Sequence, residues 1–276
     1  MSAVVAALHP RNQGFRWEPI RGPFRAITEE QARSYNERGF FLLENALDRE
    51  TVARVTAAID PFEARGEEAL RSLPGKRMFI AEADGITFTT HLVKLSPVLR
   101  EFSTSRLFVG LCCDLIGPDV RLYWDQAVYK KPEYPKPFPW HQDNGYTYIE
   151  PQAYLTCWIA LTDATIENGC PWVVPGGHLR GTLAHRLSKL GYVCREEDDG
   201  SEATPVQARA GSIVVFSSLT PHRTGPNTTK AVRKTYILQY APDGARVVET
   251  GAPCTAPDRQ YLIAKNGQAV APPALE

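Results

Sequence analysis

The order of secondary-structure signals along the chain restricts the fold more than any other feature. Helical patterns fill the first part, and from about residue 120 short β-type segments rich in Val, Ile, Tyr, Trp or Thr follow, separated by Gly, Pro and Asn. Strands and helices do not alternate, which argues against a parallel α/β sheet. We therefore predict a mainly β fold, an antiparallel sandwich or barrel with the N-terminal helices packed on one sheet.

Three helices are predicted in the first part of the chain. The first has the clearest limits, because Thr28 and Gln31 can form a capping box and Gly39 suits a left-handed C-cap. The second and third are also expected to end at glycines. The predicted helices cover 29–38, about 49–65 before Gly66, and Pro97 toward Gly117.

The β-type segments are joined by turn residues such as Asn144-Gly145. Pro132 to Pro139 holds four prolines in eight residues, which a central strand does not tolerate, so we predict a loop there over the mouth of the sheet. The predicted strands cover 120–130, 154–161, 172–174, 212–217 and 234–241.

The length of 276 residues lies near the upper limit of what one hydrophobic core supports, which favours one domain over two. We expect a single domain over 1–276. It would have helical support to about residue 118, a β core over about 119–245 and a C-terminal extension over 246–276, for which the sequence suggests no role.

Charge and apolar content exclude several classes of partner. Lys plus Arg (31) balance Asp plus Glu (31), so we expect no nucleic-acid partner. No apolar run approaches the roughly 20 residues that span a bilayer, so we expect no membrane partner either. The six cysteines form no CxxC pair, which favours a cytoplasmic protein over a secreted one. A small molecule remains as the expected partner of a monomer or small homo-oligomer.

The sequence Trp140-His141-Gln142-Asp143 is the first candidate for chemistry. Residues two apart in an extended segment face the same side, so His141 and Asp143 can bind one ion. His222 follows the apolar segment 212–217, where a jelly roll brings a later strand beside this pair. Two imidazoles and one carboxylate are typical of non-haem Fe(II) oxygenases. A zinc hydrolase with the same three residues and a non-catalytic binding barrel are the alternatives.

From Asp125 to Tyr240 the chain resembles the phytanoyl-CoA dioxygenase family of Fe(II)- and 2-oxoglutarate-dependent oxygenases. The resemblance implies a double-stranded β-helix, a jelly-roll and cupin-like barrel with the iron site at its mouth. Five blocks occur in the family's order: Gln126 leading to Lys131-Pro132, Trp140 to Asp143, Thr156 to Leu161 running to Cys170, Val174 to His178, and Gly211-Ser212 followed by His222, Thr224 and Arg233.

The resemblance also implies roles for individual residues. Arg233 would pair with the distal carboxylate of 2-oxoglutarate, since a guanidinium that points inward needs an anion. Thr224 would donate its hydroxyl beside it, unless it only stabilises a turn. Trp158 would line the same pocket, unless it is an ordinary core aromatic. The implied iron ligands are His141, Asp143 and His222, and the implied 2-oxoglutarate contacts are Arg233, Thr224, Trp158 and Gln126.

The expected reaction is the hydroxylation of a C–H bond with Fe(II) and O2, while 2-oxoglutarate is decarboxylated to succinate. Asp143 stands where related halogenases have a small residue, so we expect oxidation and not halogenation. Segments 134–138, 144–148 and 178–189 are expected to form the mouth. Their aromatic and basic residues suit a small or medium organic metabolite with an apolar body that can carry one acidic group, with an acyl-CoA ester as the alternative.

The remaining basic residues receive simpler interpretations. Lys130-Lys131 and the basic residues of 178–189 are predicted to form a solvated face, with contact to an anionic substrate as the alternative. His178 is expected to pack or cap a turn, and the sequence assigns no role to the other three histidines, His9, His91 and His185.

Overall fold

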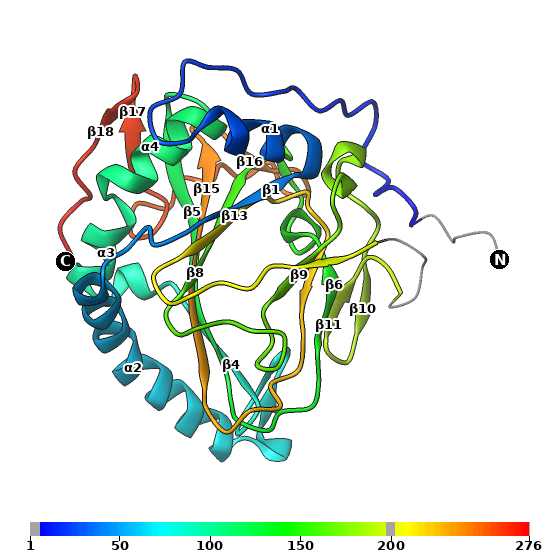
Figure 1. Cartoon of the computed structure of the whole chain (residues 1–276), viewed down its shortest axis with the longest axis vertical. Coiled ribbons are helices and arrows are strands. Elements are labelled where there is room, and N and C mark those ends of the chain that lie inside the picture. The colour runs from blue at the N-terminus through cyan, green and yellow to red at the C-terminus, as the bar shows by residue number, and fades with distance from the viewer. Residues whose placement is uncertain (1–5, 197–201, 276) are drawn as a thin grey trace.

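The computed structural model describes residues 6–196 and 202–275, and its secondary structure is mainly antiparallel β (Figure 1). The helices are α1 (Glu29–Arg38), α2 (Arg49–Ser72), α3 (Pro97–Ser103) and α4 (Arg106–Leu115). The longer strands are β1 (Phe40–Leu43), β4 (Ile86–Thr90), β5 (Val120–Lys130), β6 (Phe138–His141), β8 (Leu155–Ala160), β13 (Ile213–Ser217), β15 (Arg233–Pro242) and β17 (Leu262–Lys265). The shorter strands are β2 (Arg77–Met78), β3 (Ala81–Glu82), β7 (Ile149–Glu150), β9 (Pro171–Val173), β10 (Arg186–Ser188), β11 (Gly191–Val193), β12 (Thr204–Pro205), β14 (His222–Thr224), β16 (Arg246–Val247) and β18 (Gln268–Ala269).

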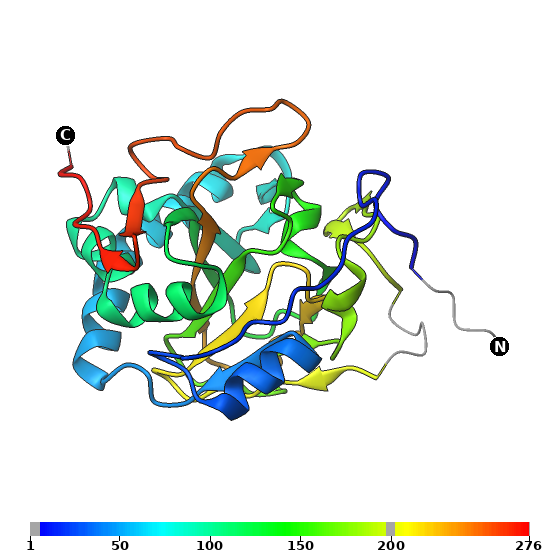
Figure 2. The same cartoon turned by 90° about the horizontal axis from the view of Figure 1, so that it is seen from above.

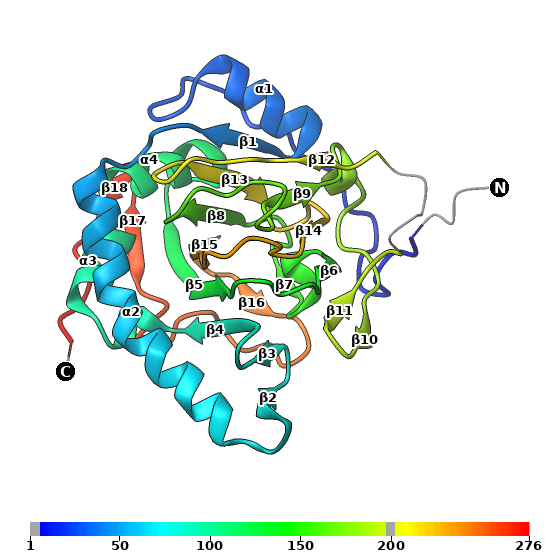
Figure 3. The same cartoon turned by 60° about the horizontal axis from the view of Figure 1, so that its bottom comes forward.

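Two antiparallel sheets form the frame of the molecule. The larger has the order β1-β13-β8-β15-β5-β4-β3-β2, with β17 and β18 attached through β5, and the smaller has the order β12-β9-β14-β6. Helices α2, α3 and α4 cover one side of the larger sheet, and the smaller sheet lies on the other side (Figure 3). The predicted jelly-roll fold with helices packed on one sheet is thereby confirmed.

Strand β8 contributes side chains to both faces of the larger sheet. Leu155, Cys157 and Ile159 belong to the core between the larger sheet and the helices. The alternate residues Thr156 and Trp158 face the space between the two sheets. Because side chains alternate along a strand, the same strand contributes to the core and to the candidate site.

The helix predictions were correct for α1 and wrong at later boundaries. The capping box of Thr28 and the left-handed Gly39 are both present. Helix α2 continues past Gly66 to Ser72, because its last turns are buried: Leu70 packs in a small apolar cluster and Glu67 accepts a hydrogen bond from the Asp84 backbone. These contacts outweigh the roughly 1 kcal/mol that glycine costs in a helix.

The predicted third helix is two helices. The chain leaves the helical path after Ser103, and α4 begins at Arg106. Here the hydroxyls of Ser103 and Thr104 donate to the carbonyls of Arg100 and Glu101. Such local bonds compete with the helical pattern.

The larger sheet takes strands from outside 119–245. Strand β1 pairs with β13, β4 pairs with β5, and β17 from the C-terminal extension also pairs with β5. The extension lies against α4 (Figure 2). The buried Arg100 donates to the carbonyls of Asp258, Pro273 and Ala274, so the extension is anchored to the helical layer.

The five predicted strands are all present, each within two residues of the predicted limits. The predicted proline-rich loop is shorter than expected, because β6 begins at Phe138 and contains Pro139. Strand β6 is the edge of the smaller sheet, where a missing N–H is tolerated. Within the described ranges, no helix has the length and apolar character needed to cross a membrane.

Candidate metal centre

His141, Asp143 and His222 bring three ligand atoms close together. Those atoms all lie within 4.8 Å of one another. Oδ1 of Asp143 is 4.0 Å from Nε2 of His141 and 3.8 Å from Nε2 of His222. Ligand atoms lie about 2.1 Å from a bound metal ion, so three atoms at these separations can reach one ion.

Strand pairing explains why the three residues meet. His141 ends β6 and is the cross-strand partner of His222, which begins β14. Gln142 continues the extended backbone and points the opposite way, where its amide nitrogen donates to the carbonyls of Gly181 and Leu219. Asp143 therefore returns to the face of His141, as the two-residue spacing predicts.

Both imidazoles are oriented by backbone carbonyls. Nδ1 of His141 lies 2.8 Å from the carbonyl oxygen of Pro139, and Nδ1 of His222 lies 3.0 Å from that of Thr220. Since a carbonyl only accepts, each Nδ1 carries the proton and each Nε2 presents a lone pair. Burial, followed by the neighbouring His222, lowers the pKa of His141 well below its ordinary value. At physiological pH His141 is thus neutral and able to bind a metal ion.

The carboxylate of Asp143 is held by a residue that the sequence did not indicate. The hydroxyl of Thr156 on β8 donates to Oδ2 of Asp143 at 2.5 Å, which leaves Oδ1 to face the two imidazoles. Gln239 on the neighbouring β15 in turn lies 3.4 Å from the Thr156 hydroxyl. Such outer contacts fix a ligand's orientation.

Arg233, the first residue of β15, is the most unusual group of the site. Its side chain is 1% exposed, and none of its three guanidinium nitrogens has a hydrogen-bond partner in the described part of the chain. Its Cζ lies 5.3 Å from the ring centre of Trp158. Burial lowers the pKa of Arg233 to about 10, so it is still charged near neutral pH. A buried cation without a counter-charge is costly, which points to an anionic ligand.

A second buried cation, Lys130, lies beside Arg233. The prediction that Lys130 belongs to a solvated face was wrong, because its side chain is fully buried. Its ammonium nitrogen donates to the Thr224 hydroxyl at 3.1 Å and to the carbonyl of Gly225. Burial, then Arg233 and Arg223, lowers the pKa of Lys130 well below its ordinary value. Lys131, its neighbour in sequence, is also largely buried and pairs with Glu63 at 2.6 Å.

The predicted cosubstrate residues share one small cavity of about 50 Å³ with the three candidate ligands. Thr224, Trp158, Gln126 and Arg233 all line it, together with His141, Asp143 and His222. Thr224 lies in strand β14, and not in a turn. The side-chain oxygen of Gln126 accepts a hydrogen bond from the indole of Trp124 at 3.3 Å.

Two histidines outside the cluster are structural. His178 contacts the carbonyl of Asn36, and burial lowers its pKa to about 4. His185 accepts a hydrogen bond from the backbone of Gln142, and burial lowers its pKa to about 4 as well. His185 thus supports Gln142, the residue between the candidate ligands His141 and Asp143, a contact that the sequence did not reveal.

Comparison with known proteins gives consistent matches over most of the chain. The family model described as phytanoyl-CoA dioxygenase (PhyH) matches residues 35–235. The methylphosphonate hydroxylase of Gimesia maris is 28% identical over 218 residues, which cover 78% of this chain and 80% of that protein. The ectoine dioxygenase of Bordetella parapertussis is 27% identical over 266 residues, covering 87% and 82%.

Among solved structures, the non-haem α-ketoglutarate-dependent carbocyclase SnoK from nogalamycin biosynthesis is similar to this chain. The TM-score is 0.69 at 25% sequence identity, and the match covers 82% of this chain and 90% of that one.

Proposed function

The chain belongs to the phytanoyl-CoA dioxygenase family, and from this membership we propose that it hydroxylates a C–H bond of a small or medium organic metabolite. It is an Fe(II)- and 2-oxoglutarate-dependent dioxygenase that uses O2. In this proposal residues 1–276 act as one oxygenase domain, with helical support to about 118, the iron site within about 119–245 and a C-terminal extension over 246–276.

The observation that carries the proposal is the unpartnered guanidinium of Arg233 in the cavity of the three candidate ligands. In the proposal His141, Asp143 and His222 hold iron through Nε2, Oδ1 and Nε2. A set of two histidines and one carboxylate leaves other metal positions open and suits Fe(II). 2-Oxoglutarate carries a carboxylate at each end, so one end can reach the metal while the other pairs with Arg233.

Thr224 and Trp158 complete the cosubstrate site in this proposal. Because the Thr224 oxygen accepts from Lys130, its own hydroxyl proton is available for the distal carboxylate. The indole of Trp158 forms a wall beside Arg233. Gln126 lines this cavity and the larger one next to it, where it can contact either cosubstrate or substrate.

Iron and 2-oxoglutarate, when bound, supply the oxidising power to insert one oxygen atom of O2 into a C–H bond, with release of succinate and CO2. The residues of the chain position the reactants and exclude water. The apolar side chains of Ile86, Val128 and Phe216 line the small cavity, and a dry site limits side reactions.

Neither alternative function explains the residues that the proposal assigns to 2-oxoglutarate. A zinc hydrolase or a non-catalytic barrel with the same three ligands gives no reason to bury Arg233 without an anion. We further propose a cytoplasmic enzyme, a monomer or small homo-oligomer, with no nucleic-acid or membrane partner. The balanced charge of the chain supports this.

Substitution of His222 tests the proposal. His222→Ala should lose stoichiometric Fe(II) binding, measured by metal analysis, and 2-oxoglutarate-dependent O2 uptake. Its circular dichroism spectrum without metal should match that of the parent protein. His9→Ala is the control, since His9 lies outside the ligand cluster. Normal iron content and turnover in His222→Ala would contradict the assignment, and activity restored only by zinc without 2-oxoglutarate would favour the hydrolase.

A further inference from the structure

We infer from the cavity beside the candidate metal centre that the substrate is a flat, uncharged aromatic molecule. This inference rests on the proposed function, because it describes what the enzyme would oxidise. The cavity measures about 500 Å³, a size that holds one drug-sized ligand. It shares Phe88, Gln126, Phe138, His141 and Asp143 with the small cosubstrate cavity, so a molecule bound in it reaches the metal.

Aromatic rings form most of the cavity's apolar wall. Eight of its seventeen lining residues are Phe, Tyr or Trp, far more than the 10% of the whole chain. Phe88 and Phe138 have ring centres 5.5 Å apart at 48°, and Tyr146 and Tyr192 have theirs 5.1 Å apart at 79°. Rings at such angles offer both faces and edges, which suits stacked and edge-on contacts with a planar ligand.

The lining of the cavity, as far as the structure describes the chain, offers no cationic side chain to neutralise an anionic ligand. No Lys or Arg of the described residues lines it, and apart from tyrosines its ionisable groups are the metal ligands His141 and Asp143. Thr90, Gln126, Thr147 and Gln239 are the neutral polar residues on the wall besides the tyrosines and Trp124, and they can bind hydroxyl or carbonyl groups of a ligand.

The hairpin of β2 and β3 and the hairpin of β10 and β11, which are distant in sequence, form the outer rim of the cavity. Met78 and Phe79, at the turn between β2 and β3, are 63% and 56% exposed. Phe79 meets Tyr192 of β11 edge to face, with ring centres 6.3 Å apart. Large apolar side chains left in water around an opening mark a ligand-binding surface.

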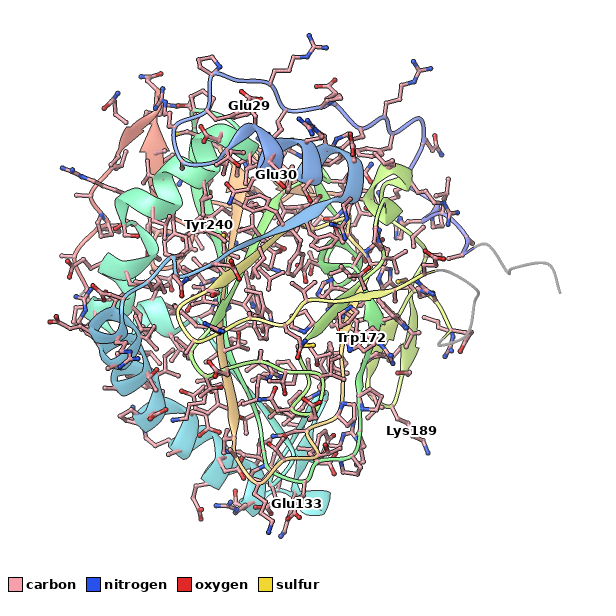
Figure 4. All side chains as sticks on the ribbon, in the orientation of Figure 1. Glu29, Glu30, Glu133, Trp172, Lys189 and Tyr240 are labelled. Carbon is pink, nitrogen blue, oxygen red and sulfur yellow. The ribbon has the colours of Figure 1, made fainter. Side chains whose placement is uncertain are left out.

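The basic side chains near this rim point elsewhere. Arg77 donates a hydrogen bond to the carbonyl of Lys189, and this bond joins the two hairpins. The guanidinium of Arg77 also lies 4.0 Å from the carboxylate of Glu82. The side chain of Lys189 extends away from the fold (Figure 4). Of the three segments expected to form the mouth, 134–138 and 144–148 line this cavity through Phe138, Tyr146 and Thr147, whereas no residue of 178–189 does. An acyl-CoA ester would find no charged partner there for its phosphates.

Calorimetric titration of the metal-free protein tests the inference with three probes. 9-Anthracenemethanol and anthracene-9-carboxylate share their rings and differ in charge, and lauroyl-CoA represents the thioester class. We expect the neutral alcohol to bind at least tenfold more tightly than the carboxylate, and lauroyl-CoA to bind more weakly than either. Equal or tighter binding of the carboxylate or of lauroyl-CoA would overturn the inference.

Two variants and a control place the binding in this cavity. Phe88→Leu should weaken binding of the alcohol by about 2- to 12-fold, the range for a lost aromatic pair. Phe62→Leu, in α2 where the ring packs against the core on the helix side of the larger sheet, makes the same truncation away from the cavity and should leave binding unchanged. Thr90→Lys should raise affinity for the carboxylate at least tenfold relative to the alcohol. Failure of Phe88→Leu or of Thr90→Lys to change binding would contradict the location.

The result is separable from the proposed function. Because the titration needs neither iron nor turnover, selective binding of the neutral probe would stand even if His222→Ala kept full activity. Loss of iron in His222→Ala together with preferred binding of charged probes would overturn only the substrate class.

Discussion

Lys130 of β5 and Arg233 of β15 are cross-strand partners, so two buried basic side chains stand opposite each other in one sheet and repel each other when both are protonated. Neither has a carboxylate partner within residues 6–196 and 202–275. Like charges placed directly opposite destabilise a sheet. In the proposed site the distal carboxylate of 2-oxoglutarate lies beside this pair and reduces the repulsion, so the pair predicts that 2-oxoglutarate binding stabilises the fold.

Arg233→Met should impair use of 2-oxoglutarate while sparing the metal-free fold. Loss of charged hydrogen bonds should raise the KM for 2-oxoglutarate by about 10- to 150-fold. Because an unpaired buried cation is removed, the metal-free variant should melt no lower than the parent. Lys234→Met is the control, since Lys234 pairs with Asp60 at 2.8 Å outside the cavity. Steady-state kinetics and thermal melting check both effects; an unchanged KM would contradict the role.

Lys130→Met should act through Thr224, which it positions. Without the ammonium, the Thr224 hydroxyl loses the donor that fixes its orientation. We expect the KM for 2-oxoglutarate to rise about fivefold, the value of one ordinary hydrogen bond, with kcat within about twofold. A fall in kcat at unchanged KM would show that Lys130 has another role.

Thr156→Val should weaken iron binding by about 10- to 100-fold, because it removes the hydrogen bond that orients Asp143. Thr87→Val is a matched control: Thr87 is also buried, and its hydroxyl donates to a carboxylate, that of Glu63, at 2.7 Å outside the site. Competition with a chromogenic chelator measures the affinity. Equal iron affinity in the two variants would show that the Thr156 contact does not orient the ligand.

Asp125 should give the stability of the protein a defined pH dependence. It is fully buried, and burial raises its pKa from 3.8 to about 6. The folded state therefore binds this proton more tightly than the unfolded chain does. The stabilising contribution of Asp125 to the free energy of unfolding is fully present below about pH 4 and is lost as the pH rises through about 6. This rise in the pKa corresponds to about 3 kcal/mol in the free energy of unfolding.

Asp125→Asn removes this titration but keeps an oxygen for the hydroxyl of Tyr236. Between pH 4 and 7 the free energy of unfolding of the parent protein should fall relative to that of the variant. Urea denaturation of the metal-free proteins measures it. Parallel stability curves would show that Asp125 does not titrate in this range.

The carboxylate of Asp143 should direct the reaction to oxidation. With Asp143 among the ligands, no metal position is set aside for a halide. Mass spectrometry of products formed in chloride or bromide should detect oxygenated products alone. A halogenated product would contradict the assigned role of Asp143.

Local signals explain what the sequence predicted well. The cap of α1 is encoded within a few residues at each end, and β5 is a continuous β-type segment, so both were located closely. Strands β1 and β4 were missed. Each is a short segment beside a helical pattern, and each pairs with a strand far along the chain. Burial of their surfaces depends on that remote pairing.

The same distinction applies to the candidate site. The spacing of His141 and Asp143 is a local pattern, and strand pairing then brings His222 opposite. Lys130 and Thr156 have no such pattern. A lysine beside a second lysine looks exposed in sequence, and its burial follows only from the register that places it against Arg233.

The carbonyls of Pro139 and Thr220 have a consequence for how the centre tolerates mutation. Each metal-facing imidazole is oriented by the backbone two residues earlier in its own segment, so no neighbouring side chain is needed to select its tautomer. Substitutions at position 220 that keep the backbone path should leave His222 correctly oriented. The two histidines therefore form a self-contained module, and the surrounding pocket can change to accept other substrates without rebuilding the metal site.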